Sequence, residues 1–154
     1  MKKIILAAFI AVMSFGAQAQ SSNEVDMMQA MFGQEKMQIV ASYVKPGKEH
    51  IEAFEKLYNE YEVERKKLGK MAIDLLNEYA EKWEGMTNEQ ADEWMKKVLD
   101  VSAKREKLIR SYYKKIKKAT TPIIATQFYQ VEIYINTSIR AAIYENIPFV
   151  GETK

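Results

Sequence analysis

Residues 83–94, WEGMTNEQADEW, contain a signal that ends one long helix and a signal that starts the next. Gly85 can adopt the positive φ that closes a helix. After Met86, the Thr87 hydroxyl can cap the following helix, while Gln90, three residues on, reaches back to the Thr87 backbone N–H. The chain is therefore expected to reverse direction here and to form a helical hairpin.

Long amphipathic helices are expected on both sides of this turn. Residues 48–84 contain no proline, and their apolar side chains recur every three or four positions, as in a helix packed on a partner. Residues 88–118 repeat the pattern. The apolar positions are Ile51, Phe54, Tyr58, Tyr61, Leu68, Ala72, Leu75 and Tyr79 before the turn, and Ala91, Trp94, Val98, Val101, Leu108 and Tyr112 after it.

Two further helices are expected outside the hairpin. Residues 24–43 are compatible with an amphipathic helix, which Pro46 and the following glycine end. A last helix should run over residues 122–146, with Thr121 as its cap and Pro122 at its first position. Its β-branched residues would also suit a strand, but the length favours a helix. The predicted fold class is all-α, with four helices in a bundle-like arrangement.

The N-terminus has the composition of a secretory signal peptide. Lys2 and Lys3 precede an apolar run over residues 4–15, too short to span a bilayer, and Ala17 and Ala19 have the A-x-A spacing of a cleavage site. We therefore expect a leader over residues 1–19, a single helical domain over 20–154, and a periplasmic product without stable membrane insertion.

Composition excludes several functions. The chain has no cysteine, which excludes disulfides, thiol catalysis and cysteine metal sites. The chain has 23 basic and 21 acidic residues, and losing the leader removes two lysines and no acid, so the mature net charge is zero. A dedicated nucleic-acid-binding protein normally carries a net basic face, so no nucleic-acid partner is expected.

Two opposite charge runs are expected to face each other. Residues 49–64 contain six acids and one lysine, and residues 104–118 contain eight basic residues and one acid. Folding about the turn brings the two runs side by side. Taken alone, the basic run would suit a phosphate or a membrane surface, but mutual neutralisation is the favoured interpretation.

Two arginines interrupt the apolar seams. Arg65 and Arg105 fall at core positions and at nearly the same level of the hairpin. Such like charges need an acid between them, and Glu132 on the last helix is the first candidate, with Glu64 as the alternative. The alternative of equal weight is that both arginines extend outward into solvent.

No catalytic or metal-binding constellation is expected. His50 is the only histidine, and there is no glycine-rich phosphate loop, so neither an enzyme activity nor a cofactor is predicted. The spacing of Met27, Met28 and Met31 could gather thioethers for Cu(I), although ordinary packing is the favoured interpretation. Nine methionines and nine tyrosines would form a soft protein-binding patch if some of them are exposed.

The segment MTNEQ, residues 86–90, resembles the LTxxQ motif of the Spy/CpxP group of periplasmic helical proteins, with methionine in place of leucine. The runs AFEKLYNEYEVERKKLG (residues 53–69), ATQFYQVE (residues 125–132) and ENIP (residues 145–148) also resemble a group of exported, largely uncharacterised bacterial helical proteins. The first resemblance implies ATP-independent chaperone activity linked to envelope stress, often by a helical dimer, or regulation of a stress sensor. Within the motif it implies a structural role for Met86, Thr87 and Gln90.

The sequence thus predicts a non-enzymatic periplasmic helper that binds unfolded or envelope proteins and could act as a homodimer. The alternative is a regulatory or sensory partner of an envelope complex without chaperone activity.

Overall fold

The computed structural model describes residues 22–152, with side chains from residue 33 onward. The expected leader lies outside these residues. The elements in chain order are α2 (Ser22–Tyr43), α3 (Gly47–Lys82), the short 3-10 helix η1 (Trp83–Gly85), α4 (Asn88–Ala119) and α5 (Pro122–Tyr144). No strand occurs between residues 22 and 152. The predicted all-α class with four α-helices is therefore confirmed, and the last of them is a helix rather than a strand.

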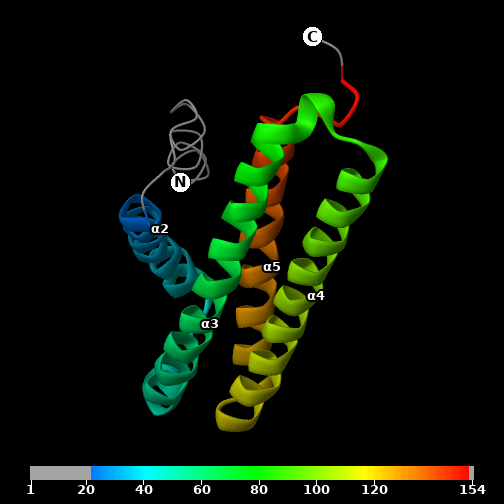
Figure 1. Cartoon of the computed structure of the whole chain (residues 1–154). Helices are drawn as coiled ribbons and strands as arrows, with labels where there is room; N and C mark the ends of the chain where they lie inside the picture. The colour runs from blue at the N-terminus through cyan, green and yellow to red at the C-terminus, as the bar shows by residue number, and fades with distance from the viewer. Residues whose placement is uncertain (1–21, 153–154) are drawn as a thin grey trace.

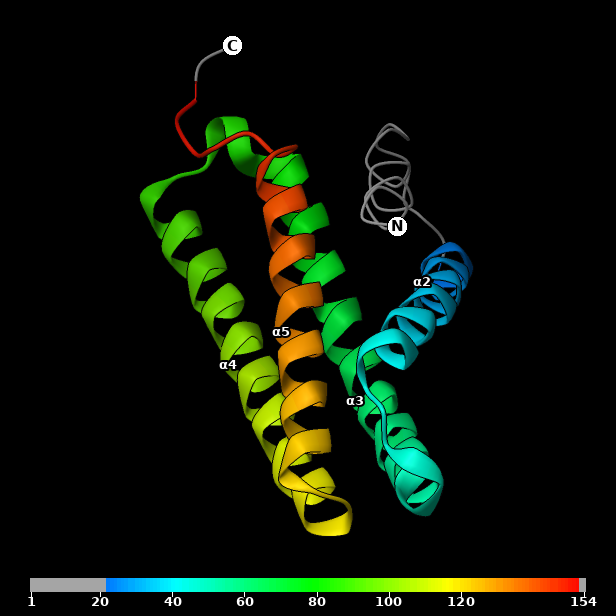
Figure 2. The ribbon, with the colours of Figure 1, turned by 180° about the vertical axis from the view of Figure 1, so that it is seen from behind.

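Helices α3, α4 and α5 run side by side with alternating directions (Figure 1). Helix α2 lies against α3 and α5 near its C-terminal end and diverges from the other helices toward its own N-terminus, as the opposite view also shows (Figure 2). The described helices include none that is both long and apolar enough to cross a membrane. The architecture is therefore a three-helix bundle with a fourth helix attached at an angle.

The turn between α3 and α4 forms where it was predicted but by a different route. The last turn of α3 tightens into η1, and Met86 is extended, with φ −66° and ψ 122°. Among the described residues, positive φ occurs at Gly47 and Gly151 and not at Gly85. The expectation of a left-handed Gly85 was therefore wrong, because the 3-10 turn and the extended residue together reverse the chain without one.

Side-chain caps fix the starts of α4 and α5. The Thr87 hydroxyl accepts a hydrogen bond from the Gln90 backbone N–H at 3.2 Å, and the Gln90 side chain accepts one from the Thr87 backbone N–H at 2.9 Å. The Thr121 hydroxyl accepts from the Ile124 backbone N–H at 3.3 Å, with Pro122 at the first helical position. Each cap supplies an acceptor to an N–H that has no partner within its helix.

The tightly packed core occupies one half of the molecule, where α2 joins the other three helices. Tyr61 is fully buried there, and its ring meets Tyr112 and Phe128 edge-on with centroids 5.5 and 5.2 Å apart. Aromatic pairs in this geometry stabilise beyond their buried area. The buried members of this cluster are Val40, Val44, Phe54, Tyr58, Tyr61, Ile109, Tyr112, Ile116, Ile124, Ala125, Phe128, Val131 and Ile135.

Alanine substitutions at Gly85 and Gly47 test this description of the turn. Gly85→Ala should leave stability unchanged or raise it by about 0.4–1 kcal/mol, because the backbone is not left-handed and a Cβ would meet nothing within 4 Å. Gly47→Ala should destabilise by about 1 kcal/mol or more, because Gly47 has φ +69° at the start of α3. Urea unfolding followed by circular dichroism measures both. A larger loss at Gly85 than at Gly47 would contradict this account of the turn.

Candidate functional site

A buried ion pair joins α2 to α5. Lys36 is 1% exposed and Glu132 is 0% exposed, and the Lys36 Nζ lies 2.6 Å from a Glu132 carboxylate oxygen. Long charged side chains are almost never fully buried unless they are paired. The pair therefore replaces the hydration that both groups lose when α2 packs on the bundle.

Side chains of helix α3 extend this ion pair into a network. Lys36 also pairs with Glu62, and the Arg65 Nε donates a hydrogen bond to the same Glu62 carboxylate at 2.8 Å. The Tyr61 hydroxyl donates to the other oxygen of Glu132 at 2.6 Å. We call Lys36, Tyr61, Glu62, Arg65 and Glu132 the buried network. It contains two positive and two negative groups, so its net charge is zero when all four are ionised.

Two aromatic rings lie beside the lysine. The Lys36 Nζ lies 5.3 Å from the ring centre of Tyr58 and 5.0 Å from that of Tyr61, within the range of a cation–π contact. Burial raises the pKa of both tyrosines well above the ordinary value, and the negative charge of Glu132 acts in the same direction. Both phenols are therefore neutral, and Tyr61 acts as a hydrogen-bond donor.

Two opposing effects set the pKa of Glu62. Burial works to raise it, but the positive charges of Lys36 and Arg65, together with their hydrogen bonds, outweigh burial, so the pKa lies below the ordinary range. The pKa of Arg65 is raised, because Glu62 outweighs the opposing effect of burial. The network therefore places opposite charges in contact where α2 packs on α3 and α5.

The predicted arginine cluster is corrected in part. Arg65 and Glu132 do belong to one buried network, but the ion-pair partner of Glu132 is Lys36, and Arg65 pairs with Glu62. Glu64, the alternative acid, is exposed and pairs with Lys67. The sequence reasoning missed Lys36 and Glu62.

The sequence does contain a signal for Lys36. It lies four residues before Val40 and eight before Val44, both of which are buried in the core. A lysine at this spacing shares the helix face of the two valines. That position could have been recognised as a buried charge in need of an acid on a neighbouring helix.

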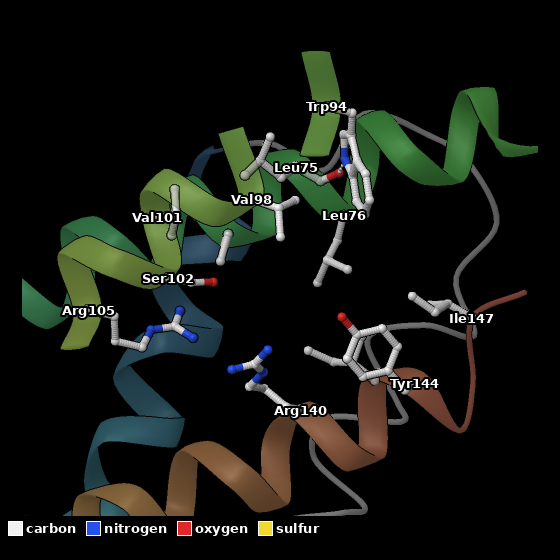
Figure 3. Close-up of a pocket in the computed structure, with 12 residues that line it drawn as sticks. Leu75, Leu76, Trp94, Val98, Val101, Ser102, Arg105, Arg140, Tyr144 and Ile147 are labelled. Carbon is white, nitrogen blue, oxygen red and sulfur yellow. Dashed lines mark hydrogen bonds between the residues drawn. The ribbon is translucent and has the colours of Figure 1, made fainter. Parts of the chain in front are cut away.

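Arg105 lies outside the network, in an apolar cleft in the other half of the bundle (Figure 3). The hairpin does bring α3 and α4 together, but Arg105 extends toward Arg140 of α5 (Figure 3), and the ion-pair partner of Glu132 is Lys36. The cleft has a volume of about 100 Å³. Its lining residues are Ala72, Leu75, Leu76, Trp94, Val98, Val101, Ser102, Arg105, Arg140, Ile143, Tyr144 and Ile147.

Trp94 and Tyr79 fix the end of the cleft near the turn. Their ring centres are 4.7 Å apart, and the Trp94 indole N–H donates to the Leu75 carbonyl at 2.9 Å. The Tyr79 hydroxyl donates to the Pro148 carbonyl at 2.8 Å, which holds the segment after α5 against α3. These contacts keep this end of the three helices together without a dense core.

The two charge runs lie on the packed helices α3 and α4, but ion pairs within single helices are prominent in them. Lys67 pairs with Glu64 at 2.7 Å in α3, and Arg110 pairs with Glu106 at 2.7 Å in α4. An ion pair between α3 and α4 forms nearer the turn, where Lys97 lies 3.0 Å from Glu78. No ion pair joins the two runs among the described residues, so the expected neutralisation by direct pairing between them is not seen.

The remaining candidates add no site in the described part of the chain. Within residues 33–152, whose side chains the structure describes, no group of three or more histidine, aspartate or glutamate side chains is placed to hold a metal ion. The side chains of Met27, Met28 and Met31 lie outside the described residues. His50 is half-buried and lies 3.6 Å from Glu49 in the first turn of α3.

Comparisons with known proteins leave the family open. No protein-family model matches the chain, and searches of curated proteins and of solved structures find no significant match.

The buried network predicts a large cost for removing Glu132. Glu132→Ala would leave Lys36 with one acid fewer and the Tyr61 hydroxyl without its acceptor. We expect a loss of about 3–5 kcal/mol, as for other broken buried pairs. Glu152→Ala, at an exposed position after α5, should cost about 1 kcal/mol or less. Thermal and urea unfolding compare the two, and equal small effects would contradict the network.

The lowered pKa of Glu62 predicts that the folded protein loses stability in acid. Because its pKa is lower in the folded state, the stabilisation is complete above the unfolded pKa of about 4.3 and is lost as the pH falls through the lower folded pKa. Between pH 5 and pH 3 the native protein should therefore lose stability more steeply than Glu62→Gln. Glu64→Gln, which changes an exposed pair of the same helix, should keep the native slope. Urea midpoints measured across this range test the difference.

Proposed function

We propose that this chain is a non-enzymatic helper of the bacterial periplasm that binds unfolded or envelope proteins through exposed apolar side chains. The observation that carries the proposal is the contrast between the two halves of the bundle. The half containing the buried network has a dense core. The half containing the cleft, which we call the open half, keeps an apolar concavity with exposed apolar residues beside it.

The exposed residues of the open half follow the helices that line the cleft. Leu99 of α4 is 58% exposed and directly follows Val98, which lines the cleft. Met71 and Met95 are likewise exposed, each next to a cleft-lining residue in the chain. Tyr144 both lines the cleft and is exposed, and Phe149 follows it, with the two rings stacked at 6.4 Å.

These residue types suit a surface that accepts several partners. Methionine is flexible and polarizable and adapts to different apolar shapes, and promiscuous binding proteins use methionine-rich surfaces for that reason. Large apolar side chains are exposed in both halves, among them Tyr43, Val63 and Ile123 of the dense half. What the open half adds is a concave apolar surface, the form that binding sites favour. The leader and the resemblance to the Spy/CpxP group support the periplasmic, chaperone-like form of the proposal.

A client-aggregation assay tests the proposal. α-Lactalbumin aggregates when its disulfides are reduced, and the reductant leaves this chain unaltered because it has no cysteine. Residues 20–154 at several-fold excess should suppress light scattering by the reduced client. Leu99→Glu should weaken suppression at least twofold, because it replaces an exposed apolar side chain of the open half with a charge.

The matched control is Ser111→Glu, which adds the same charge at an exposed position of α4 outside the open half. It should suppress aggregation as the native chain does, and circular dichroism should show both variants folded. If excess native chain left the light scattering of the reduced client unchanged, the chaperone-like function would be excluded. Recovery of one dominant partner from the native envelope would then favour the regulatory alternative.

A further inference from the structure

Two guanidinium groups lie together at one end of the apolar cleft. Arg105 comes from α4 and Arg140 from α5, and Figure 3 shows the two groups turned toward each other across the space between these helices. The hydroxyl groups of Ser102 and Tyr144 point into the same space (Figure 3). The lining therefore divides into a positively charged end and an apolar remainder.

Neither arginine has an acidic partner within the described part of the chain. No aspartate or glutamate is among the described residues that line the cleft. Burial lowers the pKa of Arg105, and the positive charges of Arg140 and Arg65 add to this effect against an opposing contribution from Tyr61. Because an arginine side chain keeps its proton in proteins, the repulsion between the two groups and the lost hydration of Arg105 are not offset by an acid among the described residues. An anion held between the two groups would offset both.

The apolar remainder of the cleft determines which kind of anion would fit. The walls beyond the arginines are provided by side chains such as Leu76 and Val98, with Trp94 at the far end. The volume of about 100 Å³ is smaller than the cavity of about 150 Å³ that holds a benzene molecule in another protein. The cleft therefore has room for a handful of carbon atoms. A longer tail would continue out through its open side.

We propose that the open half binds a medium-chain carboxylate, with the head group between Arg105 and Arg140 and the tail along the apolar walls. A carboxylate is planar and offers two acceptor oxygens, which match the paired N–H donors of a guanidinium group. The same ligand has the apolar chain that the remainder of the cleft suits. This site is for a small molecule, and it holds or fails independently of the binding of unfolded proteins proposed above.

Titration with octanoate tests the site in the full mature chain. Trp94 lines the cleft, so its fluorescence in a Trp83→Phe background reports binding at this position. Octanoate below its micelle concentration should bind saturably with one molecule per chain. Octanol lacks the charge and acetate lacks the tail, so each should bind at least tenfold more weakly.

Arginine variants locate the head group. Arg105→Gln and Arg140→Gln should each weaken octanoate binding at least tenfold. Arg110→Gln is the matched control, because Arg110 lies on α4 but pairs with Glu106 outside the cleft; it should bind octanoate as the native chain does. Arg140 is exposed, so its variant keeps the test valid should Arg105→Gln fail to fold.

Several outcomes would overturn the proposal. If octanol bound as tightly as octanoate, the site would be purely apolar. If Arg110→Gln weakened octanoate binding as much as the two cleft variants do, the overall charge of the chain would explain the attraction. Absence of saturable octanoate binding would exclude the site. Binding of a short peptide ending in leucine with a free carboxylate, without binding of octanoate, would assign the cleft to a polypeptide end instead.

Discussion

The buried pair of Lys36 and Glu132 is the constraint on which the arrangement of α2 depends. Both side chains have lost their water, and removing water from a charge costs far more than an exposed ion pair returns. The cost is offset where Glu62, Arg65 and the Tyr61 hydroxyl surround the pair. This combination exists at one position of α2 along α3 and α5. The network thus specifies where α2 attaches. The apolar contacts of Val40 and Val44 bury further surface but are less selective for that position.

The attachment of α2 divides the molecule into two unlike halves. Where α2 joins the bundle, the aromatic residues of α3, α4 and α5 are enclosed and pack edge-on at short distances. Toward the turn between α3 and α4, three helices leave a cleft and expose apolar side chains. The dense half contains the packed core, and the open half contains the cleft for which we propose binding.

The two halves differ in how their positively charged side chains are partnered. In the buried network each cation has an acid within contact distance, so the group is neutral as a whole and has no need of a ligand. At the end of the cleft, Arg105 and Arg140 face each other without an acid among the described lining residues. The first set therefore joins helices, whereas the second is the basis of the carboxylate site that we propose.

The sequence by itself determined the helices and their ends. Caps and breakers act over a few residues, so Thr87 with Gln90, and Thr121 with Pro122, fixed the starts of α4 and α5 at the predicted positions. The regular apolar spacing determined the all-α class, because each seam requires a packed partner. The sequence also marked Arg65 and Glu132 as candidates for one buried cluster, with outward extension of the arginine as an equal alternative.

Only the tertiary structure decided which charges meet. The partner of a buried charge depends on the angle and level at which separate helices cross, and spacing along one helix does not contain that information. The crossing of α2 therefore brought Lys36 to Glu132, while Arg105 turned toward Arg140 in the cleft. The backbone of Gly85 was also decided at this level, because a 3-10 turn and an extended Met86 complete the reversal that a left-handed glycine would otherwise provide.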